Sequence, residues 1–232
     1  MTPPRAGYVR AMFTRIARRY DLMNTLMTAG RHHAWRDTVA RLVAASPPGP
    51  VLDLATGTGD LAVAIREAAP ERPVVGVDFS EGMLGQARLK LQARRVRGIA
   101  LVNADALALP FAGGTFACVT SAFLLRNLED LPRGLAEMRR VTRAGGRVIT
   151  LDIVRPAMPL WGAVFGLYFG RVVPAVGALV AGDRAAYAYL PQSVNRFVSP
   201  QELARLMRAA GLREVTWRTL ALGTVALHLG VA

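Results

Sequence analysis

Two glycines, Gly57 and Gly59, mark the stretch of this chain best suited to hold a nucleotide. They follow Val-Leu-Asp-Leu at positions 51 to 54, an apolar run that predicts a buried strand. Glycine lets the backbone turn tightly beneath a ligand before a helix begins. Residues 57 to 62, Gly-Thr-Gly-Asp-Leu-Ala, also match the dinucleotide fingerprint G-x-G-x-x-G/A. The spacing therefore indicates a cofactor loop that contains both glycines, without saying which nucleotide it binds.

Carboxylates follow the next two predicted strands. Asp78 comes about twenty residues after the glycines, where a carboxylate can accept hydrogen bonds from both ribose hydroxyls. Its alternative or additional role is to cap the helix that begins near Ser80. Asp105 follows the third predicted strand and could bind an adenine amino group, while the small Ala106 leaves room for the ring. As an isolated pattern, this segment would be an ordinary turn.

Asp53, just before the loop, distinguishes between cofactors. A nicotinamide dinucleotide brings a pyrophosphate to the loop, and an adjacent carboxylate would repel it. S-adenosylmethionine has no phosphate and carries a sulfonium and an ammonium group, which carboxylates attract. The sequence therefore predicts S-adenosylmethionine as the cofactor.

The elements that must position these residues alternate between strands and helices. This alternation predicts an open parallel sheet with right-handed crossovers, whose ligand lies beyond the carboxyl ends of the strands. We expect a Rossmann-like α/β fold with seven strands, mostly parallel, and an antiparallel last strand. The strands are predicted near residues 51 to 54, 74 to 77, 99 to 102, 116 to 120, 147 to 151, 214 to 219 and 225 to 229. Helices are predicted near 59 to 69, 80 to 95, 131 to 141 and 200 to 210.

The length of 232 residues suits one α/β domain with additions. The expected parts are an N-terminal helical cap (1 to 46), a cofactor-binding core (50 to 152), an apolar helical lid (153 to 190) and a C-terminal helix with a strand pair (191 to 232). In the cap, Met12, Ile16, Tyr20 and Met23 are spaced along one helix face, which predicts that this face is buried.

Basic residues outnumber acidic ones by 29 to 16, which gives a formal net charge of +13. Eight arginines and only two aspartates occur in the first fifty residues, a pattern that suits an anionic lipid surface or nucleic acid. Because every basic residue except Lys90 is arginine, a GC-rich coding bias is the alternative explanation. The single cysteine, Cys118, and an N-terminus without an apolar signal-peptide run predict a cytoplasmic protein.

Taken together, the motifs resemble the class I S-adenosylmethionine-dependent methyltransferases, and more narrowly the ubiquinone/menaquinone biosynthesis C-methyltransferases. The general motifs are those at 53 to 60, Asp78, 109 to 111, 125 to 127 and 145 to 147. The narrower family is indicated by Arg-Tyr-Asp-Leu-Met-Asn at 19 to 24, Tyr-Ala-Tyr-Leu-Pro at 187 to 191 with Ser193, and Gly-Thr-Val-Ala-Leu-His at 223 to 228. The similarity covers nearly the whole chain.

The resemblance implies cofactor contacts from Thr58, Asp78, Asp105 and Ala106. It also places Ala122 at the cofactor, although relatives commonly have a serine there and Ser121 is the candidate to replace it. The implied reaction is methylation of a ring carbon of a polyprenylated hydroquinone, foremost demethylmenaquinol to menaquinol.

A ring carbon is a better nucleophile when a phenol oxygen beside it is deprotonated or hydrogen-bonded. Arg126 is the first candidate to act on that oxygen. Since arginine is a poor proton acceptor, it would stabilise the phenolate or hold a water that takes the proton. Asn127 and Tyr20 would orient the ring. The alternative for Arg126 is a surface ion pair with Glu129 or Asp130.

No catalytic or metal-binding role is predicted for the three histidines. His228 could act as a base, but an ordinary buried histidine on the last strand is favoured. His32 and His33 are adjacent and point to different faces of a helix. No spacing of histidines and carboxylates indicates a metal site.

Residues 156 to 182 are apolar except for Arg171 and by length alone could cross a membrane. A single crossing would separate strands of one sheet, and Pro174 would kink the helix. We therefore expect a helical cover that meets a polyprenyl tail or the inner face of the cell membrane, helped by the arginines. A homodimer interface or an internal core helix is the alternative.

Two other functions stay open. A methyltransferase of another small molecule or of RNA would suit the charge. Against RNA, no Asn-Pro-Pro-Tyr type loop follows the fourth predicted strand and no Pro-Cys pair is present, so we expect no nucleic-acid partner. A non-catalytic lipid-binding or assembly subunit with the same fold is the alternative from another class.

Overall fold

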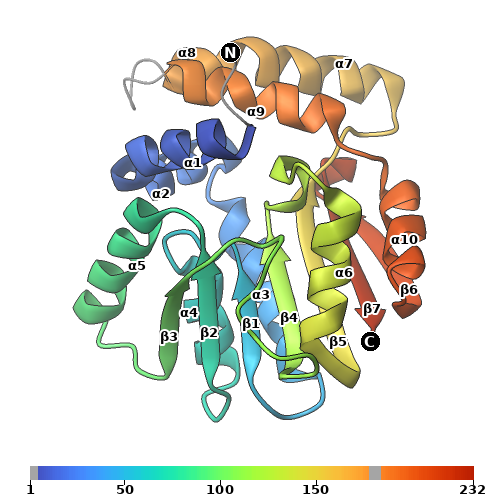
Figure 1. Ribbon diagram of the computed structural model, residues 1–232. Coiled ribbons are helices and arrows are strands. Elements are labelled where there is room, and N and C mark those ends of the chain that lie inside the picture. Colours follow the sequence, from blue (N-terminus) through green and yellow to red (C-terminus); the bar gives the residue numbers. More distant parts are fainter. Residues whose placement is uncertain (1–4, 178–183) are drawn as a thin grey trace.

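A computed structural model describes residues 5–177 and 184–232. Residues 1–4 and 178–183, which belong to the predicted cap and the predicted apolar insertion, lie outside the described residues. A seven-stranded sheet forms the centre of the molecule (Figure 1). Its strands are β1 (Val51–Leu54), β2 (Val74–Asp78), β3 (Ile99–Asn103), β4 (Phe116–Ala122), β5 (Thr142–Ile153), β6 (Arg213–Leu220) and β7 (Val225–Val231).

The strand order is β3-β2-β1-β4-β5-β7-β6, so the order reverses between β1 and β4. Strands β1 to β5 pair in parallel, and β7 runs antiparallel to both of its neighbours. The predicted fold class is therefore confirmed. In an open parallel sheet, the point of reversal opens a crevice at the carboxyl ends of the strands, where ligands bind.

Strand β5 differs from its prediction because it begins at Thr142 and not near residue 147. Gly145 and Gly146, residues of a type common in turns, lie inside the strand. Gly145 has φ +73, and its N–H donates to the carbonyl of Ala232 at 2.9 Å. The N–H of Ala232 in turn donates to the Gly146 carbonyl at 2.9 Å. Pairing with the chain terminus thus extends the strand through a segment whose residue types favour a turn.

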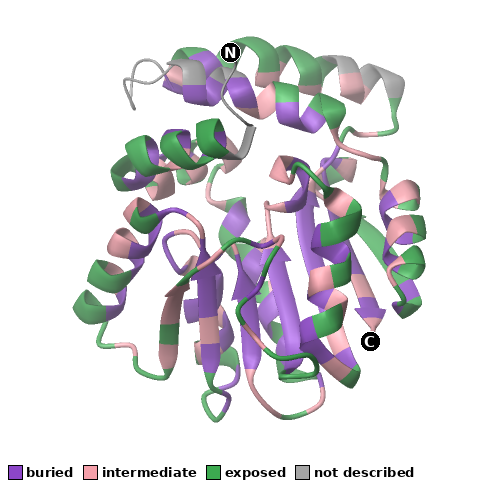
Figure 2. Ribbon diagram, in the orientation of Figure 1, coloured by how far each residue is buried: buried purple, intermediate pink, exposed green. Residues whose placement is uncertain are grey.

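Helices cover both faces of the sheet. On one face, α3 (Arg31–Ala44) and α4 (Asp60–Ala68) enclose a cluster that includes Val43, Val51 and Ile65, all without exposed surface. On the other face, α6 (Leu131–Val141) and α10 (Pro200–Ala209) pack Met138 and Met207 against the sheet. Helix α5 (Glu81–Ala93) lies beside β2 and β3. Figure 2 shows the central strands as buried and the outer helix surfaces as exposed.

Above the carboxyl ends of the strands lie two further layers (Figure 1). The first consists of α1 (Arg5–Ile16), the short turn η1 (Ala17–Arg19) and α2 (Tyr20–Thr28). The second consists of α7 (Pro159–Leu167), the π-helical turn η3 (Tyr168–Val172), α8 (Val173–Val176) and α9 (Arg184–Arg196). Of the four residues predicted to face inward in the cap, Met12, Ile16 and Met23 are buried and Tyr20 is partly buried. Within the described residues, no helix combines the length and apolarity needed to cross a membrane.

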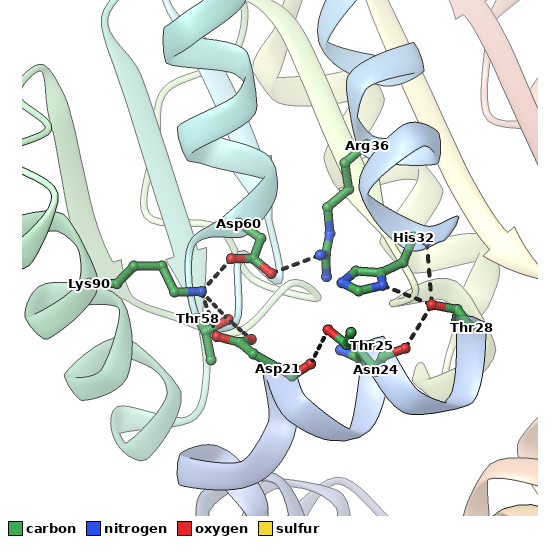
Figure 3. A network of polar contacts seen from close by, with 9 residues as sticks. All are labelled: Asp21, Asn24, Thr25, Thr28, His32, Arg36, Thr58, Asp60 and Lys90. Carbon is green, nitrogen blue, oxygen red and sulfur yellow. Dashed lines mark hydrogen bonds and ion pairs between the residues drawn. The ribbon is translucent and has the colours of Figure 1, made fainter. Parts of the chain in front are cut away.

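A polar network joins the first of these layers to the cofactor-binding core (Figure 3). Lys90 of α5 places its Nζ 2.6 Å from Asp21 Oδ2 of α2 and also pairs with Asp60, the first residue of α4. Thr58 Oγ1 donates to Asp21 Oδ1 at 2.6 Å, and Arg36 Nη1 donates to Asp60 Oδ2 at 2.7 Å. Burial acts to raise the pKa of Asp60, but the charges of Arg36 and Lys90 outweigh it and lower that pKa. The one lysine of the chain therefore holds three elements together.

We predict that Lys90→Met lowers the free energy of unfolding by about 2 kcal/mol. It leaves two carboxylates without their shared cation, and the loss stays below the roughly 3–5 kcal/mol of a fully buried pair because Asp21 is partly exposed. Urea denaturation followed by circular dichroism measures the change. The matched control is Arg88→Met on the same helix, whose ion pair with Glu81 is exposed and contributes about 0–1 kcal/mol. Equal losses in the two variants would contradict the role of Lys90.

Candidate functional site

A cavity lies at the carboxyl ends of β1, β2 and β4, where the strand order reverses. We call it the first cavity. It brings together Gly57, Asp78, Asp105, Ala106 and Ala122, five of the seven residues predicted to bind the cofactor. The loops that follow four different strands therefore meet in one place, as the sheet topology requires.

Gly57 and Gly59 both adopt left-handed backbone conformations, with φ of +56 and +85. Only glycine enters this region without steric cost, which explains the two glycines of the loop. A Cβ on Gly57 would meet nothing within 4 Å, so its backbone is open to the first cavity. Thr58 and Gly59 do not line the cavity. Gly59 precedes the first residue of α4, and the Thr58 hydroxyl is turned toward Asp21.

Asp78 joins the two loops that border the first cavity. Its Oδ2 accepts a hydrogen bond from Gly57 N at 2.9 Å, and its Oδ1 accepts one from Ser80 N at 2.8 Å. Burial raises the pKa of Asp78 to about 6. The N-cap of α5 is Ser80, whose hydroxyl accepts from Met83 N at 3.3 Å. Asp78 thus supports the start of this helix without being its cap, and its carboxylate borders the cavity.

The end of β3 supplies the other side of the first cavity. Asp105 is exposed, and its Oδ1 accepts a hydrogen bond from Leu107 N at 2.9 Å. Ala106 is buried and its side chain occupies little space. On β4, Ala122 lines the cavity, whereas Ser121 is buried and lines neither this cavity nor its neighbour. Ser121 is therefore not placed to replace the serine of the relatives.

Asp53 requires a correction, because its carboxylate does not border the first cavity. It is 1% exposed and accepts hydrogen bonds from Thr56 Oγ1 at 2.7 Å and Thr120 Oγ1 at 3.1 Å. Burial raises the pKa of Asp53 to about 6. The carboxylate binds Thr56, the residue before Gly57, and so has a structural task in the glycine loop. Asp53 marks the correct loop in the sequence, although it does not line the cavity.

A second cavity adjoins the first. Phe13, Tyr20, Phe123 and Asn127 line both of them, and Arg126 lines the second. The second cavity is enclosed by α1, α2, α3, α9 and the turn η2 (Leu125–Asn127), so the cap and the apolar insertion supply most of its walls. The structure therefore brings the three predicted catalytic residues together. Tyr20 and Asn127 lie at the junction of the two cavities, and Arg126 lines the second cavity.

Arg126 is buried, so the alternative that it is a surface residue is wrong. Its Nη1 forms an ion pair with Asp152 Oδ1 at 2.6 Å and donates to the Phe123 carbonyl at 2.8 Å. The Arg126 backbone N–H donates to Asp152 Oδ2 at 3.3 Å. Burial raises the pKa of Asp152, and the charge of Arg126 opposes that rise. Two contacts from one carboxylate hold both the backbone and the guanidinium of Arg126.

Phe123 lies at the junction of the cavities in a left-handed conformation, with φ +64. Its carbonyl accepts hydrogen bonds from Arg126 Nη1 and from Asn127 Nδ2, the latter at 3.1 Å. Asn127 Oδ1 is buried and has no hydrogen-bond partner in the part of the chain that the structure describes. An orphaned acceptor at the junction is a ready partner for a hydroxyl group of a bound molecule.

Sequence reasoning missed two residues of this site. Asp152 lies near the end of β5, and the rule that strand ends carry ligand-binding groups could have identified it. His32 was set aside because of its neighbour His33, yet it is buried and lines the second cavity. His228 lines neither cavity, and its Nε2 lies 2.9 Å from the Pro200 carbonyl oxygen.

Comparisons with known proteins agree with this geometry. The ubiE/COQ5 methyltransferase family matches residues 1–232. A demethylmenaquinone methyltransferase of Deinococcus radiodurans is 46% identical over 222 residues, which are 96% of this chain and 91% of that protein. A ubiquinone/menaquinone biosynthesis C-methyltransferase of Paracoccus denitrificans is 38% identical over 227 residues, 97% of this chain and 91% of that protein.

Among solved structures, a S-adenosylmethionine-dependent methyltransferase of Thermotoga maritima has a TM-score of 0.66. It is 20% identical and covers 96% of this chain and 99% of its own, which shows the shared fold. The residues of the first cavity suit S-adenosylmethionine. The carboxylate of Asp78 can accept hydrogen bonds from the ribose hydroxyls, and the small Ala106 leaves space for the adenine ring. The backbone at Gly57 leaves space for the methionine part of the cofactor.

We predict that affinity for S-adenosylhomocysteine, the demethylated cofactor, falls as the pH drops below about 6. Ribose hydroxyls need the ionised carboxylate of Asp78, and burial raises the pKa of this group to about 6. Protonation then opposes binding, and affinity falls by about tenfold per pH unit well below that pKa. Titration calorimetry at several pH values measures the effect.

Asp78→Asn should remove this pH dependence and weaken binding at neutral pH by roughly 10- to 100-fold, the loss expected for hydrogen bonds to a charged group. Asp53→Asn is the matched control, since Asp53 has the same raised pKa and no place in the cavity lining. An unaltered pH dependence in the Asp78 variant would refute the assignment.

Proposed function

The chain belongs to the ubiE/COQ5 methyltransferase family, and from this premise we propose that it methylates a ring carbon of a polyprenylated hydroquinone in menaquinone or ubiquinone biosynthesis. The observation that carries the proposal is the junction of the two cavities, where Phe13, Tyr20, Phe123 and Asn127 face both. The relatives named demethylmenaquinone methyltransferase favour demethylmenaquinol as the acceptor. The protein is an enzyme, and the non-catalytic alternative loses its support.

When bound, S-adenosylmethionine would supply a methyl group attached to a positively charged sulfur. The leaving group is then S-adenosylhomocysteine, a neutral thioether. In this proposal Asp78 binds the ribose, Asp105 and Ala106 border the adenine, and Gly57 and Ala122 border the remaining part. Thr58 and Gly59 contribute by fixing the loop, because Gly59 permits the left-handed turn and Thr58 bonds to Asp21 of the cap.

The acceptor ring binds in the second cavity, with the carbon to be methylated at the junction. Arg126 stabilises the developing phenolate, since its guanidinium is held in place by Asp152 and keeps its charge. Asn127 Oδ1 accepts a hydrogen bond from a ring hydroxyl, and Tyr20 orients the ring from the cap. Residues 1–232 act as one methyltransferase domain, in which the cap and the lid close the site from above.

The prenyl tail is proposed to leave the site on the side of the helical lid, where the protein touches the membrane. Large apolar side chains are exposed on α7 and η3, namely Val164, Leu167 and Val172. Leu22 and Leu26 are exposed on the neighbouring layer, at α2. Together with the exposed arginines of the cap, Arg10, Arg15, Arg18, Arg19 and Arg31, they would hold the cytoplasmic protein on the inner face of the cell membrane.

We predict that the purified protein converts demethylmenaquinol to menaquinol with S-adenosylmethionine, as measured by mass spectrometry of the extracted quinones. Arg126→Met should lower kcat by about 10²-fold or more, because one preorganised group that stabilises the developing charge is lost. Affinity for S-adenosylhomocysteine should stay unchanged, since Arg126 does not line the first cavity. Arg205→Met, at an exposed ion pair on α10, is the control. A protein that binds the cofactor and methylates no hydroquinone would overturn the proposal.

We predict that the protein floats with liposomes that contain anionic lipid at low salt and is released by high salt, because salt screens the attraction of the arginines. Leu167→Glu should weaken this binding, since it places a charge on the apolar surface. Leu89→Glu, exposed on α5, is the matched control. If Leu167→Glu left liposome binding unchanged and instead converted a dimer to a monomer in analytical ultracentrifugation, the apolar surface would be a homodimer interface and not a membrane contact.

A further inference from the structure

His32 is the feature of the second cavity that the proposed function does not yet use. It lies on α3, is 2% exposed and lines the cavity together with Arg126, Asn127 and Tyr20. Its neighbour His33 is exposed and does not line either cavity. Within the helix, only one of two adjacent histidines is thus directed to the place where the acceptor ring would bind.

The hydrogen bonds around His32 determine which ring nitrogen carries its proton. His32 Nδ1 lies 2.8 Å from Thr28 Oγ1. The Thr28 hydroxyl already donates its hydrogen to the Asn24 carbonyl at 2.7 Å, so Nδ1 must be the donor in this contact. Nε2 then carries a lone pair. Figure 3 shows Nδ1 turned to Thr28 and the other ring nitrogen turned away from it.

Burial, helped by the neighbouring Arg36, keeps the ring of His32 neutral. Burial lowers the pKa of His32 to about 4, and Arg36 and His33 act in the same direction, whereas Asp60 and Asp21 oppose them. At neutral pH the imidazole therefore has a free lone pair and accepts a proton from a sufficiently acidic group. Asp60, which pairs with Arg36 at 2.7 Å, and Asp21 are near enough to stabilise the imidazolium once it forms.

Other described residues that line the second cavity offer no comparable base. No aspartate or glutamate is among them. Arg126 has no lone pair to give, and a neutral tyrosine such as Tyr20 or Tyr189 is an acid before it is a base. Asn127 Oδ1 can accept a hydrogen bond but does not take up a proton at physiological pH. Among the described residues that line this cavity, His32 alone is a neutral base with a nitrogen lone pair.

We propose that His32 is the proton acceptor of the methyl transfer, with Nε2 taking the hydrogen of the methylated ring carbon. This inference rests on the proposed function. After the new carbon–carbon bond has formed, the carbon holds both a methyl group and a hydrogen, and the ring is no longer aromatic. Its C–H electron pair returns to the ring as the proton passes to Nε2, and the imidazolium later gives this proton to water. Because the restored aromaticity makes this carbon strongly acidic, a weak base suffices.

The experiment compares demethylmenaquinol with its analogue that carries deuterium at the methylated carbon. In His32→Asn, the Nδ2 amide can still donate to Thr28, but the base is missing. We expect kcat to fall by about 10²-fold, the lower range for loss of an acid–base group. Proton removal then limits the rate, so the deuterium isotope effect on kcat becomes larger than in the wild type. A merely structural role would lower kcat and leave the isotope effect unchanged.

His33→Asn is the matched control and should leave both quantities as they are, because His33 is exposed and lines neither cavity, although its ring lies tilted against that of His32 with centroids 4.0 Å apart. If His32→Asn fails to fold, as shown by circular dichroism, His32→Gln is measured by the same criterion. An isotope effect that does not increase in the His32 variant overturns the inference. A wild-type protein that methylates no hydroquinone overturns the proposed function instead, so the two failures are told apart.

Discussion

A buried carboxylate must receive hydrogen bonds, and Asp78 receives them from Gly57 N and Ser80 N. These two bonds connect the loop after β1 with the helix start after β2. This carboxylate therefore fixes the glycine loop and the start of α5 relative to each other. Its burial has a chemical effect as well, because it raises the pKa and brings the ionisation of the site close to the physiological range.

The cap also restrains the glycine loop. Thr58 belongs to this loop by sequence, yet its hydroxyl donates a hydrogen bond to Asp21 of α2 and accepts one from Lys90 Nζ at 3.1 Å. The same cap supplies Tyr20, which lines both cavities. The contacts that hold the cap on the core are therefore continuous with those that shape the cofactor loop, and the acceptor cavity exists only because the cap is docked. One continuous set of contacts thus holds the walls of both cavities in place.

The sheet could be predicted because its central strands, such as β1 and β2, are short apolar runs and because the alternation with helices allows few topologies. The residues proposed to bind the cofactor were predicted from their places at strand ends. Asp53 and Thr58 were located correctly in the chain, but sequence patterns do not say to which side of a loop a side chain turns. The tasks of Asp152 and His32 depend on Arg126 and Thr28, partners that only the folded chain brings within hydrogen-bonding distance. The start of β5 was missed because its partner is the chain terminus, a contact between distant parts of the sequence.

Phe123 has a left-handed backbone that residues with a side chain seldom adopt, and this conformation costs of order 1–3 kcal/mol. The strained carbonyl is fixed by two donors, Arg126 and Asn127, which are also the groups proposed to meet the acceptor. The conformational entropy of these two side chains is therefore lost when the protein folds and not when the substrate binds. Strain in the resting enzyme is in this sense a form of preorganisation, since less order has to be created at each turnover.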